Sequence, residues 1–267
     1  MRELSWKSIK PRLMPAFRLW QQWGEPVLPL YRILRTLYSY PGYIKDWRQY
    51  RMLPGAESLA VKDAYPVLLE RTPITPFDPH YLYQAVWATE RIVSATQSRH
   101  IDVGSDIRFA AMLASHMPVT FVDIRPLQVD VPGFSSMAGS LFGLPFADGG
   151  VESVSCLHVI EHVGLGRYGD PLDPGGTRRA CAELQRVVAP GGNLFLSTPV
   201  GRARVQFNAH RIHTPTQILA MFPDLTLVEF SGVDDQGSLV RNADLHKFGG
   251  AHYACGLFWL RKEIAGS

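Results

Sequence analysis

A first group of residues that could do chemistry lies in the run Ile101-Asp102-Val103-Gly104-Ser105-Asp106. Gly104 can turn the backbone tightly and let it approach a ligand, because glycine has no Cβ. The helix expected after this turn offers free backbone N–H groups to an anion such as a carboxylate. Asp123, 19 residues after Gly104, closes the apolar run VTFVDI, where its carboxylate could accept both hydroxyl hydrogens of a ribose. Ordinary strand-end turns use the same residue types, so both interpretations stay open.

Histidines that could move a proton lie in two later stretches. His158, Glu161 and His162 follow an apolar run, and His210 and His213 belong to FNAHRIHTP. Histidine accepts a proton near neutral pH, because its ordinary pKa is about 6.5. We predict that His162 is the catalytic base, with His210 as second candidate. Helix capping or a hydrogen bond to the backbone is the alternative role for each.

Polar residues beside these histidines are candidates for binding the substrate. Asn208 and Arg211 lie in FNAHRIHTP, and the guanidinium of Arg211 could pair with a carboxylate or phosphate. The stretch GLGRYGDPLDPGG adds four more, which are Arg167, Tyr168, Asp170 and Asp173. Gly, Pro and Asp at this density also form turns. A hard-cation site needs about six oxygens, so we expect sugar or structural contacts here and no metal.

The elements that must position these residues alternate along the chain. Apolar runs of strand length occur at 100–103, 119–124, 151–157, 193–198, 225–230 and 254–260, with a weaker run at 127–131. Helical patterns occur at 81–95, 107–116, 177–188 and 216–221. This alternation predicts an α/β fold whose parallel sheet is covered on both faces and binds ligands at the carboxyl ends of its strands. A long loop before the final run predicts an antiparallel last strand, so we expect seven mostly parallel strands.

Charge divides the chain into two parts. Residues 1–55 contain ten Lys and Arg against three acidic residues, a charge of +7, so the remainder carries −4 of the total +3. We predict a basic amphipathic helical extension over 1–55 and a catalytic domain over 56–267. Nucleic acid is not an expected substrate, because the predicted catalytic region is net acidic.

Apolar side chains recur every three or four residues in the extension, in two stripes: Trp6, Ile9, Leu13, Phe17 and Trp20, then Leu30, Ile33, Leu34, Leu37 and Tyr38. Such stripes usually pack on their own domain or on a second subunit. Peripheral contact with an anionic membrane is the alternative. Three scattered cysteines and the lack of a signal-peptide or membrane-spanning pattern lead us to expect a cytoplasmic protein, peripheral at the inner face of the membrane if the alternative holds.

The most specific patterns are LPFADGGVESVSCLHVIEHV and ELQRVVAPGGNLFLSTPVG. They resemble the middle and late motifs of the class I S-adenosylmethionine (SAM) dependent methyltransferases, over about residues 98–260. Together with DVGS, GLGRYGDPLDPGG and FNAHRIHTP they resemble the domain-of-unknown-function 268 family, whose bacterial members are associated with surface polysaccharide synthesis. The resemblance implies a Rossmann-like fold, SAM as cofactor with S-adenosylhomocysteine as product, and O-methylation of a sugar in a surface glycan or its precursor. Methyl transfer to oxygen or nitrogen of another small molecule, and a non-catalytic partner protein with this fold, are the alternatives.

The resemblance also implies roles for single residues. It places Asp102, Gly104 and Ser105 at the methionine part of SAM and Asp123 at the ribose. It places Ser140 and Leu141 near the adenine and His158 near the methyl donor. The side chains expected to meet the substrate are Glu161, Arg167, Tyr168, Asp170, Asp173, Asn208, Arg211 and His213. The first loop of the general motif has three glycines, whereas this chain retains only Gly104.

Overall fold

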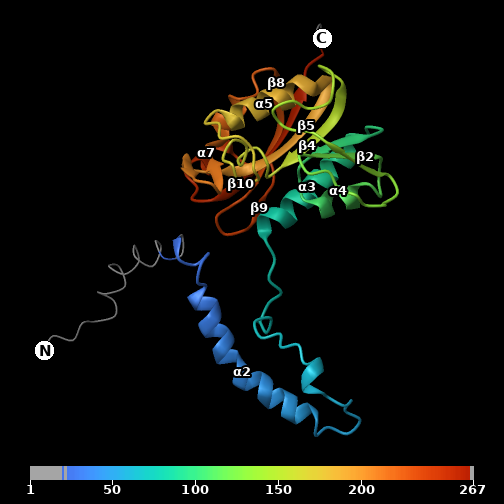
Figure 1. The fold of residues 1–267 in the computed structure, drawn as a ribbon. Helices are drawn as coiled ribbons and strands as arrows, with labels where there is room; N and C mark the ends of the chain where they lie inside the picture. The colour runs from blue at the N-terminus through green and yellow to red at the C-terminus, as the bar shows by residue number, and fades with distance from the viewer. Residues whose placement is uncertain (1–19, 21–22, 265–267) are drawn as a thin grey trace, which may run out of the picture. The chain divides into compact units, whose positions relative to one another are not determined.

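The computed structural model describes residues 20 and 23–264, and the chain divides into two compact units, Met1–Pro76 and Phe77–Ser267. The first unit, blue to cyan in Figure 1, contains helix α2 (Leu30–Tyr50) and the 3-10 helix η1 (Val61–Asp63). The division after Pro76 differs from the boundary after residue 55 that the charge pattern suggests. Residues 51–78 contain no regular element apart from η1, and they belong to the first unit as far as Pro76.

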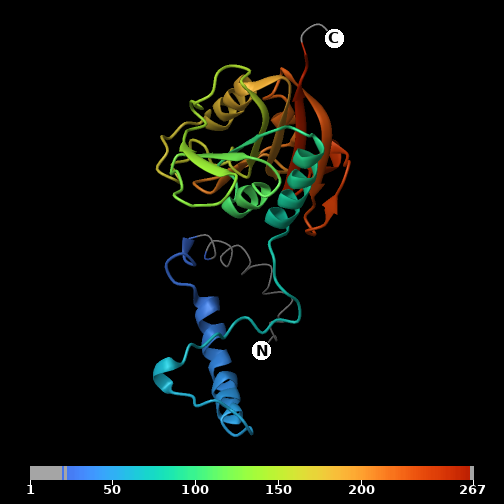
Figure 2. The same cartoon turned by 90° about the vertical axis from the view of Figure 1, so that its right-hand side faces the viewer.

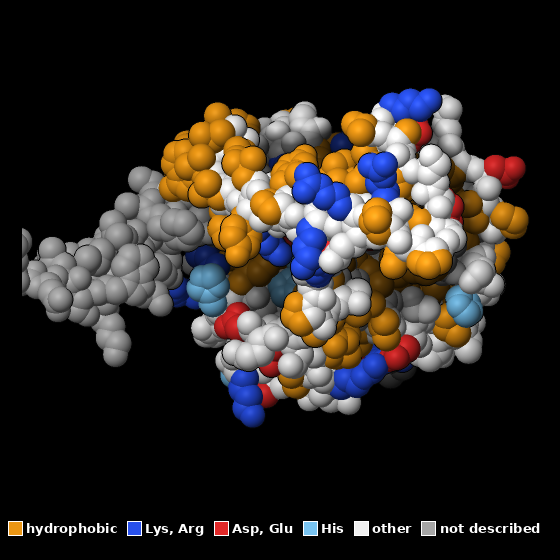
Figure 3. Space-filling view, turned by 90° about the horizontal axis from the view of Figure 1, so that it is seen from below, with side chains coloured by type: hydrophobic (Ala, Val, Ile, Leu, Met, Phe, Trp, Pro, Cys, Tyr) orange, Lys and Arg blue, Asp and Glu red, His pale blue; other side chains and the backbone are white. Residues whose placement is uncertain are grey.

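The second predicted apolar stripe lies on α2. No residue of this helix is buried, and its basic Arg48 lies in the last turn, where the helix dipole favours a cation. Figure 3 shows one side of the molecule, on which hydrophobic side chains lie exposed beside Lys and Arg side chains. The first stripe lies outside the described residues except for Trp20. In the described part of the chain, no helix is both long and apolar enough to cross a membrane.

The second unit is built on an eight-stranded sheet with the order β3-β2-β1-β4-β5-β10-β8-β9. The strands are β1 (His100–Val103), β2 (Val119–Asp123), β3 (Phe134–Ala138), β4 (Val151–Leu157), β5 (Val188–Val200), β8 (Leu225–Val233), β9 (Leu239–Val240) and β10 (Ala254–Lys262). β1 to β5 pair in parallel, and β10 runs antiparallel to both β5 and β8. The predicted Rossmann-like sheet with a reversed last strand is confirmed, and β9 adds one edge strand. A separate hairpin holds β6 (Arg204–Gln206) and β7 (His210–Ile212).

The predicted third strand, 127–131, is wrong. The strand beside β2 is β3, which comes after the turn at Pro132-Gly133 and pairs with β2 from Val119↔Phe134 to Asp123↔Ala138. The sequence FSSMA of β3 is not an apolar run, because an edge strand needs little burial. Backbone pairing therefore selected this segment over the more apolar one.

Helices cover both faces of the sheet. α3 (Pro79–Ser94) and α4 (Ile107–Leu113) lie side by side on one face in Figure 1 and Figure 2, and α5 (Gly176–Val187) lies on the other. Short helices α6 (Pro215–Leu219) and α7 (Leu245–Gly249) join the α5 side. Side chains of β5 point alternately to the two faces of the sheet. Phe195 packs with α3 and α4, whereas Leu194 and Leu196 pack with α5.

Helix α3 is fixed at both ends, and this holds its first turn at the carboxyl edge of the sheet. Asp78 caps the helix by accepting from the backbone N–H of His80 (2.9 Å) and Tyr81 (3.3 Å). Further along, Trp87 Nε1 donates to Glu229 of β8 over 2.9 Å, and the Arg91 guanidinium lies 3.0 Å from the same carboxylate. The position of His80 and Tyr81 is therefore set by contacts spread over the whole helix.

Candidate functional site

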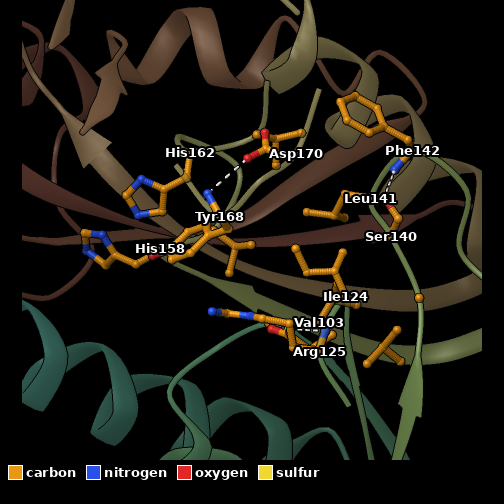
Figure 4. Close-up of a pocket in the computed structure, with 16 residues that line it drawn as sticks. Val103, Ile124, Arg125, Ser140, Leu141, Phe142, His158, His162, Tyr168 and Asp170 are labelled. Atoms are coloured by element: carbon orange, nitrogen blue, oxygen red, sulfur yellow. Dashed lines mark hydrogen bonds and ion pairs between the residues drawn. The ribbon is translucent and has the colours of Figure 1, made fainter. Parts of the chain in front are cut away.

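A pocket opens where β1, β2 and β4 end (Figure 4). Its lining comes from four segments of the chain: 103–104, 122–125, 139–142, and finally His158, Val159, His162, Val163, Tyr168 and Asp170. This is the place at which open parallel α/β sheets bind ligands. In Figure 4, Ser140 and Phe142 lie at one end of the pocket, and His158 and His162 lie at the other.

The first loop has the turn that its sequence predicts. Gly104 has φ +68°, and a Cβ at this residue would lie 3.2 Å from Val159 Cγ1, so only glycine fits without strain. Asp102 and Ser105 support this loop from beneath and do not line the pocket. Asp102 Oδ1 accepts from the Ser105 N–H over 3.1 Å, and burial raises the pKa of Asp102 to about 6. Ser105 Oγ in turn accepts from Leu157 N–H over 3.0 Å.

Asp123 presents one carboxylate oxygen to the pocket. Its Oδ1 accepts from the backbone N–H of Arg125 over 2.7 Å. Its Oδ2 faces Gly104 and would lie 3.7 Å from a Cβ atom added to that glycine. The Arg125 guanidinium lies 5.0 Å from the centre of the Tyr168 ring, a cation–π contact across the pocket mouth. Asp123 can thus accept hydrogen bonds from a ligand in this pocket.

The far end of the pocket is a tight turn. Ser140 Oγ accepts from the Phe142 N–H over 3.1 Å, and the buried Leu141 lines the pocket as well. Both residues predicted at the adenine therefore lie in the pocket wall. Backbone groups and an apolar side chain here suit a flat heterocycle.

Arg186, on α5, holds the loop that follows this turn. Its guanidinium donates to Leu144 O (3.2 Å) and Phe146 O (2.9 Å), while Glu183 accepts from Leu144 N–H over 2.5 Å. The two α5 side chains also pair with each other over 2.7 Å. The LPFADGG stretch is therefore held in place by α5, a role that its own sequence does not reveal.

His158 and Glu161 form a buried pair at the end of β4. Nδ1–H of His158 donates to Glu161 Oε1 over 2.8 Å, and Glu161 is fully buried. Burial lowers the pKa of His158, but the facing Cys255 and Glu161 outweigh it and raise this pKa to about 10. Burial works to raise the pKa of Glu161, and His158 outweighs burial and lowers it. Glu161 positions His158 here and cannot reach a substrate as predicted.

His162 has the geometry of a proton acceptor in the pocket wall. Its Nδ1–H donates to Ala209 O over 2.6 Å, so the lone pair that can take a proton is on Nε2, which lies 3.7 Å from Glu161 Oε1. Burial lowers the pKa of His162, so the ring is neutral near pH 7. His210, whose ring lies 6.4 Å from that of His162, is outside the lining, and its Nε2 lies 2.5 Å from Gln206 Oε1.

The carboxylates of the GLGRYGDPLDPGG loop hold the loop itself. Asp170 Oδ2 accepts from the Gly164 N–H over 2.6 Å, although Asp170 also lines the pocket. Asp173 Oδ1 accepts from Gly175 N–H over 2.8 Å, and its Oδ2 lies 3.0 Å from Arg179. Turn formation, the structural alternative, accounts for both.

Arg167 and Tyr168 form the exposed part of the same loop. Arg167 Nη1 donates to Ala209 O over 3.0 Å, and its guanidinium carbon lies 5.3 Å from the centre of the Tyr168 ring. The Tyr168 ring also meets His162 edge to face, with centroids 5.8 Å apart. An aromatic face and a cation therefore stand beside the predicted base.

Three predicted substrate contacts lie elsewhere. Arg211 is buried, and its guanidinium donates to Val163 O (2.5 Å) and Asp173 O (2.9 Å), so it binds the loop between β4 and α5 and not a substrate anion as expected. Asn208 is exposed in the β6–β7 turn, away from the lining. His213 is also outside it, and its buried Nδ1 has no hydrogen-bond partner among the described residues.

Aromatic residues that the sequence patterns did not single out complete this end of the site. His80 stacks on His158 (centroids 5.6 Å apart) and on Tyr253 (5.2 Å), and Tyr81 stacks on His158 (5.5 Å). Tyr253 also lies 5.1 Å from the His210 ring. His80 and Tyr81 start α3, and Tyr253 precedes β10, so only the pairing of the sheet and the docking of α3 bring them together.

One family matches part of this chain in sequence. The family described as Caenorhabditis protein of unknown function, DUF268, matches residues 149–262. The predicted resemblance to that family is confirmed over this range, which includes GLGRYGDPLDPGG and FNAHRIHTP. No curated protein matches the chain in sequence.

Solved structures share the fold of the second unit. The [4+2]-cyclase SpnF superposes with a TM-score of 0.51 at 16% identity, covering 68% of this chain and 82% of that one. A chain of the complex between the Haloferax volcanii Trm112 methyltransferase activator and the candidate methyltransferase reaches 0.50 at 14%, covering 70% and 92%. A candidate sarcosine dimethylglycine methyltransferase from Galdieria sulphuraria reaches 0.50 at 12%, covering 68% and 86%. At these identities the likeness establishes the fold alone, and the cyclase illustrates that one fold hosts several reactions.

Proposed function

We propose that the second unit binds SAM and transfers its methyl group to a small acceptor. The observation that carries this proposal is the pair formed by Gly104 and Asp123 at the pocket, with Asp123 Oδ2 turned toward the left-handed glycine. This arrangement suits a nucleoside whose ribose bonds to the carboxylate while its tail passes the glycine. SAM would then span the pocket from the Ser140-Leu141 turn to His158.

Binding of SAM and S-adenosylhomocysteine can be measured by calorimetry on the full chain. The substitution Asp123→Ala removes the carboxylate from the ribose position, whereas Asp130→Ala removes an exposed carboxylate outside the pocket. Hydrogen bonds to a charged acceptor contribute about 1.5–3 kcal/mol each, so we expect Asp123→Ala to weaken binding about 10-fold or more. A folded wild type that binds neither compound would favour the non-catalytic alternative.

For the acceptor we propose a hydroxyl group, with His162 as the base. Methyl transfer from a sulfonium is an in-line displacement, so the protein must mainly align the acceptor and take up its proton. The Nε2 of His162 is the available lone pair, because Ala209 O occupies Nδ1–H. The acceptor oxygen would form a bond to the methyl carbon while the carbon–sulfur bond breaks and the proton passes to His162.

Among hydroxyl compounds we propose a sugar. The support is the Tyr168 ring beside His162, flanked by Arg125 and Arg167, since an aromatic face can stack on the C–H face of a pyranose while cations bind its oxygens. Surface polysaccharide intermediates, suggested by the family resemblance, belong to this class.

Methyl transfer to sugars with and without a carboxylate, and to amines of similar size, would test the acceptor class. Transfer to sugars with loss of at least 100-fold in kcat in His162→Ala supports the proposal. Methylation of amines alone would contradict the hydroxyl acceptor. A fully active His162→Ala would remove this histidine as the required base.

A further inference from the structure

Two histidines and a cysteine that are far apart in the chain meet beside the pocket. His80 comes from the first turn of α3, His158 from the end of β4 and Cys255 from the start of β10. One ligand atom from each, two imidazole nitrogens and a thiol sulfur, lies within 4.8 Å of both others. Since no spacing in the sequence links these positions, the sequence predicts no metal here.

The side chain of His158 is oriented as a metal ligand would be. Its Nδ1–H is held by the buried Glu161 carboxylate, so Nε2 is the nitrogen turned to the cluster. That Nε2 is buried and has no hydrogen-bond partner among the described residues, and the side chain is only 5% exposed. A buried polar atom without a partner is costly, and a carboxylate behind a histidine is the usual support of a metal-bound imidazole.

The other two ligands are supported as well. Cys255 is fully buried, on a strand that pairs with both β5 and β8. His80 is half-buried, with its ring stacked between those of His158 and Tyr253. The first turn of α3 thus places the His80 imidazole next to the unpaired Nε2 of His158 and the thiol of Cys255.

We propose that His80, His158 and Cys255 form a zinc site. Zinc prefers imidazole nitrogen at about 2.0–2.1 Å and thiolate sulfur at about 2.3 Å, so tetrahedral ligands stand about 3.4–3.6 Å apart. From the 4.8 Å limit of the observed cluster, the ligand atoms would move together by at most about 1.2–1.4 Å. A thiolate and two imidazoles do not suit Mg²⁺ or Ca²⁺, which take oxygen ligands.

Binding zinc releases protons from the ligands. The Cys255 thiol gives its proton to solvent and becomes a thiolate, and any proton on His158 Nε2 leaves in the same way. Three protein ligands leave the fourth tetrahedral position for water or a ligand oxygen or sulfur, the arrangement typical of catalytic zinc. His158 also lines the pocket, so the metal would lie at the pocket's histidine end.

The test uses the full chain with any histidine tag removed, treated with chelator and then titrated with zinc chloride alone. We expect one zinc per chain by elemental analysis, and at least a 10-fold loss of affinity in His80→Gln and in Cys255→Ala. Cobalt(II) supplies a second measurement, because a thiolate ligand gives a charge-transfer band that Cys255→Ala should abolish.

Matched controls come from the same chain. Cys181→Ala changes another buried cysteine, and His246→Gln changes another helical histidine, and both should bind zinc as the wild type does. Circular dichroism establishes that each variant is folded. A folded wild type that binds no zinc, or a Cys255→Ala protein that keeps the cobalt–thiolate band, would overturn the proposal. Neither measurement depends on SAM, so loss of zinc and loss of SAM binding are separate results.

Discussion

Replacing Gly104 by alanine tests the first loop through stability and binding together. The residue has φ +68°, where an alanine costs about 1–2 kcal/mol. The added Cβ would lie 3.2 Å from Val159 Cγ1, so that side chain must also move by a few tenths of an ångström. A loss of about 1–2 kcal/mol lowers the melting temperature of a unit of this size by about 2–8 °C.

The same Cβ would point to the ligand side of the loop, 3.7 Å from Asp123 Oδ2. It therefore stands between the carboxylate and the path of the proposed SAM tail, and we expect affinity for SAM to fall at least 10-fold, or about 1.4 kcal/mol. Differential scanning calorimetry measures the first effect and titration calorimetry with SAM measures the second.

Gly249→Ala is the control for this pair of measurements. A Cβ at Gly249 meets no atom within 4 Å, and this residue lies in α7, outside the pocket. It should leave both the melting temperature and SAM affinity near the wild-type values. If Gly104→Ala matched the wild type in both measurements, the assigned loop conformation and its role at the pocket would be refuted.

Three further predictions concern the supports of the site. Burial favours the neutral form of Asp102, whose pKa is about 6 in the folded state and about 3.8 in the unfolded state. The contribution of this carboxyl to the free energy of unfolding is therefore full below pH 3.8 and is lost as pH rises through 6. The unfolding free energy of Asp102→Asn, measured relative to the wild type by urea titration, should therefore rise by about 3 kcal/mol from pH 3.8 to pH 7. A difference that does not change with pH would contradict this. Arg186→Ala should lower the unfolding free energy by about 1–3 kcal/mol through lost bonds to two loop carbonyls, while the exposed Arg178→Ala should not. Arg211→Met should lower the unfolding free energy by about 2–4 kcal/mol but leave the KM for the acceptor unchanged in the folded fraction. A rise in KM without a loss of stability would indicate that Arg211 contacts the substrate.

Local patterns in the chain were sufficient for much of the second unit. The period of apolar residues predicted β1, β2, β4 and the helices α3 to α5 close to their observed bounds, because burial on both faces of a parallel sheet requires long apolar runs. Gly104 and Asp123 could be selected from their positions at strand ends, since parallel strands deliver their carboxyl ends to one edge. Both residues line the pocket.

Residues whose environment depends on distant contacts could not be predicted in the same way. Arg211 lies in a polar stretch typical of a binding loop, yet Val163 and Asp173 accept from its guanidinium because the loop between β4 and α5 closes over it. The strand β3 contains too few apolar residues to be recognised, and pairing with β2 determines it.

The sequence by itself determined the alternation of elements, the left-handed glycine and the carboxylate after β2, because each follows from the chemistry of neighbouring residues. Only the tertiary structure decided that His80 and Cys255 meet His158. Their approach requires α3 to dock through Trp87 and Arg91 on Glu229, and β10 to insert between β5 and β8. The contacts of α3 with Glu229 join residues more than 100 positions apart, and no local pattern encodes the partner of a side chain at that separation.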